Sequence, residues 1–228
     1  MTSDLSRRRG VLFDLDGTLV DTNYPHVLAW WHAFRTAGYT VAMSDIHRKV
    51  GMGADLLVAA LIDSDDEQVA TGHRHFYAPY LEQLQPFPAA AELLRTTARL
   101  GLEVVVASSA EQEEVDALMA ALGVDDVVSV VTSSADAAAA KPAPDILAAA
   151  LAQAGLQAAD CVLVGDTVWD VAAAAEAGMP CVGVLSGGIS AAELRDAGAV
   201  EIYRDAAELL EKIHDSRLGE LGRAAGSR

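Results

Sequence analysis

The chain has few cysteines, few basic residues and no long apolar run, and each shortage excludes a class of protein. Its 228 residues include two cysteines, Cys161 and Cys181, which both begin apolar segments and are expected to be buried core thiols rather than a disulfide or a catalytic thiol. Sixteen Lys and Arg against 33 Asp and Glu give a formal net charge of −17. This charge repels nucleic acid and anionic membranes, so neither is expected as a partner. No run approaches the roughly 18 apolar residues of a membrane span, and a cytoplasmic location is expected.

What the chain has instead is an alternation of short apolar runs and helical patterns. Hydrophobic residues make up 52% of it, enough for a sizeable core. Five apolar runs predict strands, at residues 12–15, 102–107, 127–132, 161–164 and 181–184. The segments between the later runs predict helices that end at glycines. This repetition predicts an α/β fold with a doubly wound, parallel, Rossmann-like sheet.

Residues 21–86 break the alternation, because they carry helical patterns with no strand between them. Pro86 and Pro88 close this block, since proline resists continuation of a helix. The predicted organisation is an α/β core made of residues 1–20 and 87–228, with an all-helical cap inserted at residues 21–86. The polar segment 216–228 is predicted to be a frayed tail. The alanine run 137–140 is expected to be helix or loop without a functional role.

The most informative segment is Gly10–Leu19, in which an apolar run ends in Asp14 and Asp16 and continues as Gly17-Thr18. Burying an ionised carboxylate is costly, and two neighbouring like charges cost more. Such a pair is tolerated where a cation, a shared proton or a transferred phosphoryl group compensates it. The segment therefore predicts a charged reaction centre at the end of a strand.

Three later segments place polar residues at comparable points of the pattern. They are Ser108 and Ser109 after the run 104–107, Lys141 just before a predicted helix, and Asp166 and Asp170 after the run 162–164. The carboxyl ends of parallel strands meet at one edge of a sheet, and ligands bind there. These residues are therefore predicted to converge with the two acids of the first segment. For Lys141 and Asp170 the competing interpretation is a solvated side chain.

Taken together, the four segments resemble the motifs of the haloacid dehalogenase-like hydrolase superfamily, in its helical-cap phosphatase branch, which includes phosphoglycolate phosphatase and beta-phosphoglucomutase-like proteins. The resemblance spans roughly Val11 to Leu185. It implies a phosphatase that uses Mg²⁺ and an aspartyl-phosphate intermediate to hydrolyse a small phosphorylated metabolite. A monomer or a weak homodimer is expected.

The resemblance also implies catalytic roles for individual residues. Asp14 is the expected nucleophile, and Asp16 is the expected acid for the leaving group and base for water. Ser108 and Ser109 are expected to bind a phosphoryl oxygen. Lys141 is expected to offset the negative charge of the carboxylates and the phosphate.

The same resemblance implies a metal site. The expected ligands are the Asp14 carboxylate, the Asp16 backbone carbonyl and the Asp166 carboxylate, a small oxygen set of the kind that Mg²⁺ accepts. Asp170 is expected to hold a metal-bound water or to orient the ligands.

The helical block is expected to determine substrate specificity, but its residues do not identify the substrate. His26, close to the junction with the core, is the substrate-binding candidate. For the other polar or aromatic candidates a packing or surface role is favoured; they are Trp30, His32, Arg35, Lys49, Arg74, His75 and Tyr80.

Two alternatives to a phosphatase stay open. A sugar-phosphate mutase is suggested by His26 and Trp30, but the stretches Gly51–Ala54 and Gly165–Thr167 depart from the mutase pattern. A non-catalytic ligand-binding fold is disfavoured because no motif position is degenerate. The presence of Asp16 disfavours dehalogenase and phosphonatase chemistry.

Overall fold

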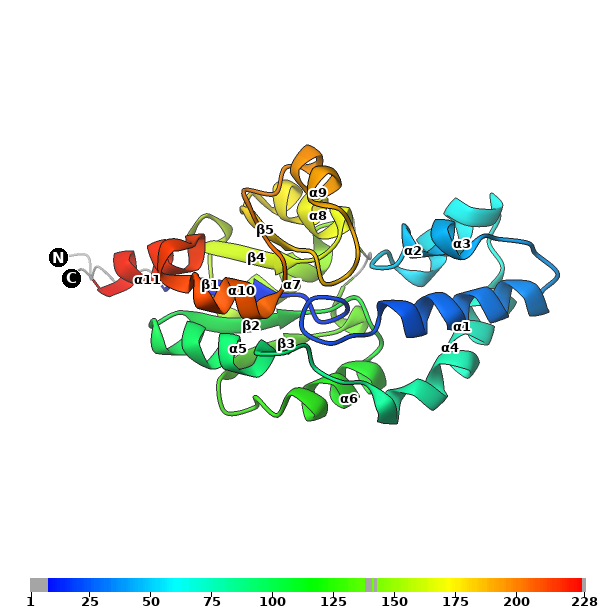
Figure 1. The fold of residues 1–228 in the computed structure, drawn as a ribbon, viewed down its shortest axis with the longest axis horizontal. Helices are drawn as coiled ribbons and strands as arrows, with labels where there is room; N and C mark the ends of the chain where they lie inside the picture. Colours follow the sequence, from blue (N-terminus) through cyan, green and yellow to red (C-terminus); the bar gives the residue numbers. More distant parts are fainter. Residues whose placement is uncertain (1–7, 138–140, 142, 227–228) are drawn as a thin grey trace.

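A six-stranded sheet lies at the centre of the computed structural model, which describes residues 8–137, 141 and 143–226 (Figure 1). The strands are β1 (Gly10–Phe13), β2 (Glu103–Ala107), β3 (Val128–Thr132), β4 (Cys161–Gly165), β5 (Cys181–Val184) and β6 (Glu201–Tyr203). Their order is β3-β2-β1-β4-β5-β6, and every neighbouring pair is parallel. The predicted doubly wound, parallel α/β sheet is confirmed.

Helices cover both faces of the sheet, because the strands are apolar on both sides. Val11 and Phe13 point into one hydrophobic cluster, and Leu12 points into the other. The first cluster is completed by α5 (Ala90–Arg99), α6 (Gln112–Leu122), α10 (Ala206–Glu211) and α11 (Arg217–Gly226). The second is completed by α7 (Asp145–Ala154), α8 (Val168–Ala177) and α9 (Ala191–Ala197).

The first strand differs from the predicted one in its position. β1 ends at Phe13, two residues before the predicted end, so Asp14 is the first residue beyond the strand. The Asp14 backbone N–H still donates to the Val164 carbonyl at 3.0 Å. This bond continues the pairing with β4 and fixes the backbone that carries the side chain.

The C-terminal segment was predicted to be frayed over residues 216–228, and this is wrong for residues 217–226, which form α11. Leu218 is fully buried, and the Ser216 hydroxyl accepts the Leu218 N–H at 3.2 Å. The helix was not predicted because its apolar residues are widely spaced within a polar segment that contains glycines. Only one face of the helix is buried. Residues 227–228 and three residues of the alanine run, 138–140, lie outside the described residues.

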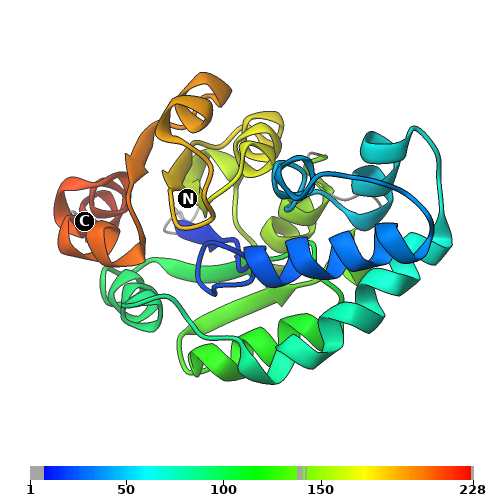
Figure 2. The same cartoon turned by 45° about the vertical axis from the view of Figure 1, so that its right-hand side comes forward.

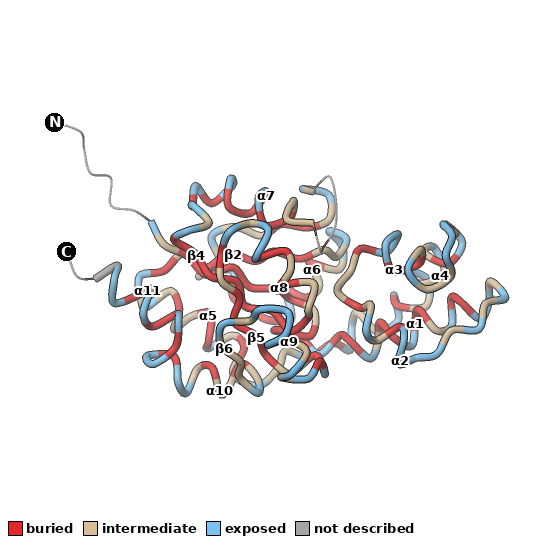
Figure 3. Tube along the Cα trace, turned by 90° about the horizontal axis from the view of Figure 1, so that it is seen from above, coloured by how far each residue is buried: buried red, intermediate tan, exposed pale blue. Residues whose placement is uncertain are grey.

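Between β1 and α5 the chain forms four helices and a 3₁₀ segment, which lie together at one end of the molecule (Figure 2). They are α1 (Asn23–Thr36), α2 (Met43–His47), α3 (Ala54–Ile62), α4 (Glu67–Tyr77) and η1 (Ala78–Gln83). These elements enclose a hydrophobic cluster of their own, which includes Trp30, Phe34 and Leu57. Figure 3 shows the buried parts of these helices beside the buried sheet. We call residues 23–83 the cap.

The two links between cap and core lie side by side. Asp21 N–H donates to the Gln85 carbonyl at 3.0 Å, and Phe87 N–H donates to the Leu19 carbonyl at 2.9 Å. The cap also approaches the core at Gly51, whose φ is +94° and where a Cβ would lie 2.9 Å from Thr167 Cγ2. Among the described residues no helix combines the length and the apolar character that a bilayer span needs.

Candidate active site

Neighbouring strands deliver the predicted polar residues to one edge of the sheet. Asp14 follows β1, Ser108 follows β2, and Asp166 follows β4. β1 lies between β2 and β4, and parallel strands end at the same edge. The convergence predicted from the sequence is therefore present, on the side of the sheet that faces the cap (Figure 1).

Lys141 lies between two carboxylates of this edge. Its Nζ is 2.5 Å from Asp14 Oδ1 and 2.6 Å from Asp170 Oδ1, and the residue is 1% exposed. Burial alone would lower the pKa of Lys141, but the two carboxylates outweigh it and raise the pKa above its usual value. The lysine is a buried counter-charge and not a solvated side chain.

Asp14, Asp166 and Asp170 form a cluster whose ligand oxygens all lie within 4.8 Å of one another. Burial raises the pKa of Asp14 to about 7, and Asp170 adds to this, although Lys141 opposes it. Burial also raises the pKa of Asp166 well above its usual value, and the neighbouring carboxylates reinforce it. One lysine leaves three buried carboxylates undercompensated, so the cluster fits a hard cation with oxygen ligands such as Mg²⁺.

Asp170 is fixed by the start of α8. Its Oδ2 accepts the Thr167 backbone N–H at 3.0 Å and the Thr167 hydroxyl at 2.5 Å, which forms a capping box. Asp170 is only 1% exposed, so the competing interpretation as a solvated helix acid does not apply. Its second oxygen remains directed at Lys141.

Sequence reasoning missed three residues that hold the cluster. The Thr18 hydroxyl lies 3.2 Å from Asp14 Oδ2 and 3.1 Å from Asp166 Oδ1. Asn23, the first residue of α1, donates from Nδ2 to Asp166 Oδ2 and to the Gly187 carbonyl, both at 3.0 Å. A Cβ at Gly187 would overlap Asp166 Oδ2, so the backbone there requires glycine. Thr18 belongs to the first motif and could have been named, whereas the other two have no local signal.

Asp16 lies in a second charged group, with His26 of the cap and Glu114 of α6. His26 Nε2 is 3.4 Å from Asp16 Oδ1 and 3.1 Å from Glu114 Oε1. Burial would lower the pKa of His26, but the two carboxylates outweigh it and raise the pKa to about 10. Burial would likewise raise the pKa of Asp16, but His26 holds it below its usual value. This group is an ion triad that joins cap to core, with His26 buried and the two acids half-buried. No local pattern in the sequence points to Glu114.

An aromatic wall made of His26, Tyr77, His73 and Trp30 borders the triad. The His26 and Tyr77 rings stack at 4.0 Å, and the His73 and Trp30 rings also stack at 4.0 Å. His73 Nε2 lies 3.1 Å from His26 Nδ1. Burial lowers the pKa of His73 well below its usual value, and the charge of His26 adds to this, so His73 is neutral beside a charged His26.

A cavity of about 190 Å³ opens between the wall and the edge of the sheet. Its core side includes Asp14, Asp16, Ser109, Glu114 and Lys141. Ser109 Oγ is buried and has no hydrogen-bond partner among the described residues. Ser108 is fully buried, and its Oγ lies 3.5 Å from Asp16 Oδ2 and accepts the Ala110 N–H at 3.0 Å. Of the two predicted serines, Ser109 is the one that lines the cavity.

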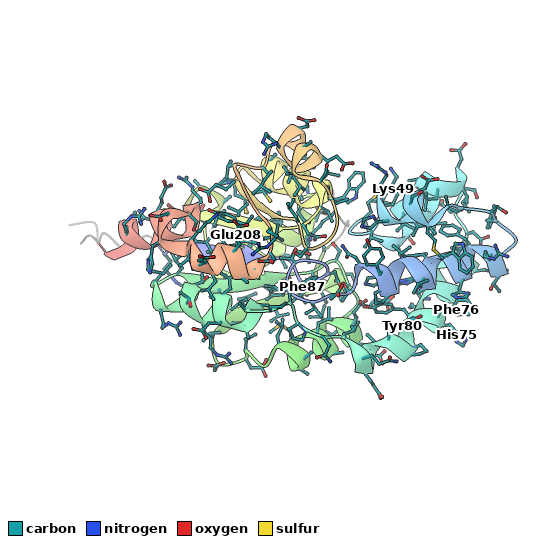
Figure 4. The ribbon with its side chains drawn as sticks, in the orientation of Figure 1. Lys49, His75, Phe76, Tyr80, Phe87 and Glu208 are labelled. Atoms are coloured by element: carbon teal, nitrogen blue, oxygen red, sulfur yellow. The ribbon has the colours of Figure 1, made fainter. Side chains whose placement is uncertain are left out.

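The cap candidates divide between the cavity and other places. His26, Trp30 and Arg74 line the cavity. Lys49 lies on the side of the cap that faces the core, with Nζ 5.2 Å from the centre of the Trp169 ring (Figure 4). The remaining candidates pack on other residues: His32 and His75 on Phe76, Arg35 on Trp31, and Tyr80 on the core cluster.

Residues 9–178 match the model of the haloacid dehalogenase-like hydrolase family, and the chain belongs to this family. It is 34% identical over 189 residues to a phosphoglycolate phosphatase of Yersinia pestis, which covers 78% of this chain and 82% of that protein. It is also 34% identical over 214 residues to the protein SUPPRESSOR OF QUENCHING 1, chloroplastic, of Arabidopsis thaliana. That match covers 90% of this chain but only 20% of the plant protein.

Solved structures share the fold. A hydrolase from Pseudomonas syringae superposes with a TM-score of 0.85 at 32% identity, covering 91% of this chain and 99% of that one. CbbY from Rhodobacter sphaeroides, solved in complex with phosphate, gives a TM-score of 0.72 at 22% identity and covers 89% of this chain and 96% of its own. The second likeness concerns the fold alone. The predicted family is confirmed.

Proposed function

We propose that this protein is a Mg²⁺-dependent phosphatase that hydrolyses a small phosphorylated metabolite through an aspartyl-phosphate on Asp14. The carrying observation is the buried Asp14 carboxylate, which lies 2.5 Å from Lys141 Nζ at the carboxyl end of β1 and lines the cavity. The similarity to phosphoglycolate phosphatases supports the same reaction class.

In this proposal Asp14 attacks phosphorus and splits hydrolysis into two steps. Lys141 favours the ionised form of the nucleophile, against the effect of burial, and Thr18 orients its second oxygen. Ser109 Oγ, which lacks a partner within the described chain, is available to donate to a phosphoryl oxygen. Ser108 acts through its contact with Asp16, which it orients.

Asp16 moves the protons. In the free protein His26 favours its ionised form, which is the form that accepts a proton from the attacking water in the second step. When a phosphoryl dianion binds beside it, the like charge raises its pKa, so that Asp16 can carry the proton that the leaving oxygen receives.

The cofactor assignment extends this proposal. Asp14 and Asp166 would hold Mg²⁺ together with the Asp16 backbone carbonyl, and Asp170 would position Lys141 and the other ligands. The metal supplies charge neutralisation at the transferring phosphoryl group. Thr18 and Asn23 fix the Asp166 carboxylate for this purpose.

The test is phosphate release from a panel of phosphorylated metabolites, with and without Mg²⁺. The Asp14→Asn variant should lose turnover while remaining folded, because the side chains are nearly isosteric. Asp65→Asn, at an exposed cap position, is the matched control and should keep full activity. Release that persists in Asp14→Asn would refute the nucleophile, and faster isomerisation than release would favour a mutase.

A further inference from the structure

We propose that the site prefers phosphate monoesters whose leaving group is small, uncharged and partly apolar, over esters that carry a carboxylate or a second phosphate. This inference rests on the proposed phosphatase function, because it concerns the part of the cavity that would receive the leaving group.

The first argument is the charge of the cavity lining. Three cations line the cavity, and each is already paired with a carboxylate. Lys141 lies between Asp14 and Asp170, and His26 lies between Asp16 and Glu114. Arg74 of α4 is 3.3 Å from Glu111. Among the described lining residues, every cation therefore has a carboxylate partner with which a second anion would compete.

The entrance formed by α6 adds negative charge. Glu111 precedes this helix, and Glu113 and Glu114 lie in its first turn; all three line the cavity. Glu111 and Glu113 are exposed at the mouth of the cavity, and Glu114 is half-buried. A carboxylate on the leaving group would come close to these three like charges, which repel it. The α6 side therefore selects against anionic leaving groups.

The second argument is the surface that the cap presents. Trp30, Met52, Leu57 and Leu81 line the cavity together with the ring of Tyr77. His73 contributes a neutral ring, since its pKa lies well below the usual value. An apolar leaving group that packs against these side chains would be removed from water, which is favourable. It would bring no polar group of its own that needs a hydrogen-bond partner. This surface comes from three separate cap segments and is independent of the charge argument.

The third argument is size. The cavity measures about 190 Å³, which is below the roughly 300–1,000 Å³ of pockets that hold drug-sized ligands. Part of this volume is needed for the phosphoryl group at Asp14. The remaining volume fits a leaving group of a few carbon atoms.

Phosphoglycolate carries a carboxylate, so we expect this protein to disfavour it as a substrate, despite the similarity of the chain to phosphoglycolate phosphatases. A sharp test compares phosphoglycolate with its carboxamide, phosphoglycolamide, which has the same shape without that charge, and with butyl phosphate as an apolar ester. Phosphate release would be measured with Mg²⁺, with Asp14→Asn as the blank. We expect kcat/KM for the amide and for the butyl ester to exceed that for phosphoglycolate by about tenfold, with the gap narrowing at high salt.

A variant tests the charge argument separately. Glu111→Gln removes the partner of Arg74 and leaves its guanidinium free for an anion. The ratio of kcat/KM for phosphoglycolate to that for the amide should rise several-fold in this variant. The matched control is Glu67→Gln, at an exposed position in the first turn of α4, the helix that carries Arg74. This variant should leave the ratio unchanged.

The outcomes are distinct. Preference for the amide and the butyl ester, with the ratio shifted by Glu111→Gln, supports the inference. Preference for phosphoglycolate or for a bisphosphate, still dependent on Mg²⁺ and Asp14, overturns the substrate class and leaves the phosphatase intact. No release from any ester by folded protein overturns the proposed function, and the inference falls with it.

Discussion

The two sides of the cavity are built in different ways. On the core side, Asp14 and Asp166 follow directly after β1 and β4, and the Asp14 N–H continues the hydrogen bonds of the sheet. On the cap side, Trp30, Leu57 and Tyr77 come from three different helices and meet only because these helices pack on one another. The core side is buried charge, and the cap side is aromatic and apolar. In the proposed function, this difference assigns the reaction chemistry to the end of the sheet and the selection of the substrate to the cap.

The largest effect that would test this division is expected for Lys141→Ala. Removing the lysine leaves Asp14 and Asp170 buried without their counter-charge, which should cost about 3–5 kcal/mol of unfolding free energy and abolish activity. Denaturant unfolding and phosphate release measure both losses. Lys212→Ala removes the exposed ion pair with Glu208, the residue labelled in Figure 4, and should change stability by less than about 1 kcal/mol. Equal losses in the two variants would contradict the role of the buried lysine.

The second effect concerns Asp16, which touches both sides. Asp16→Asn should lower kcat by roughly 10²–10⁴-fold for an alkyl ester, since the leaving oxygen then lacks its proton donor. The loss should be smaller for a nitrophenyl ester, whose leaving group departs without a proton. Steady-state kinetics with the two esters measure the difference. An equal loss on both esters would contradict the role of Asp16 as proton donor to the leaving oxygen.

The third effect concerns the metal. In the proposed site, Mg²⁺ binds the folded protein alone and should raise Tm progressively with its concentration, while chelation removes activity. Asp166→Asn should abolish this shift, because it removes a ligand held by Thr18 and Asn23. Thermal unfolding across a magnesium titration makes the measurement, with Asp65→Asn as control. If Mg²⁺ still raises Tm in Asp166→Asn, the metal binds at a site that does not include Asp166.

The smallest effect is a pH dependence in the triad. The pKa of His26 is raised from 6.5 to about 10 by Glu114 and Asp16, with Tyr77 and neutral His73 packed against it. Its stabilisation is complete below pH 6.5 and is lost as the pH rises towards about 10. His26→Gln should therefore flatten the fall of Tm across that range in chelator.

The control for that measurement is His75→Gln, an exposed cap position (Figure 4), which should keep the slope of the parent protein. An unchanged slope in His26→Gln would show that the triad does not stabilise the junction of cap and core through the charge of His26.

Some site residues could be predicted from the sequence, and others could not. Asp14, Ser108 and Asp166 could be placed because each ends an apolar run, and the end of a buried parallel strand is a position with one spatial meaning. The frayed tail was a wrong prediction, because Leu218 is buried by a surface that the C-terminal segment does not itself reveal. Glu114 was missed because its partner, His26, is distant in sequence and belongs to the cap.

The sequence by itself determined five of the six strands, their parallel pairing and the carboxylates at their ends, since apolar periodicity and the cost of buried charge act over a few residues. It also identified the family through those same segments. The short edge strand β6 was not predicted. Only the tertiary structure decided that Asn23 and Gly187 hold Asp166, that His26 is shared by Asp16 and Glu114, and that the cap lines the cavity with apolar side chains. These arrangements depend on how the cap docks on the core, and docking brings together side chains whose separation in sequence carries no local signal.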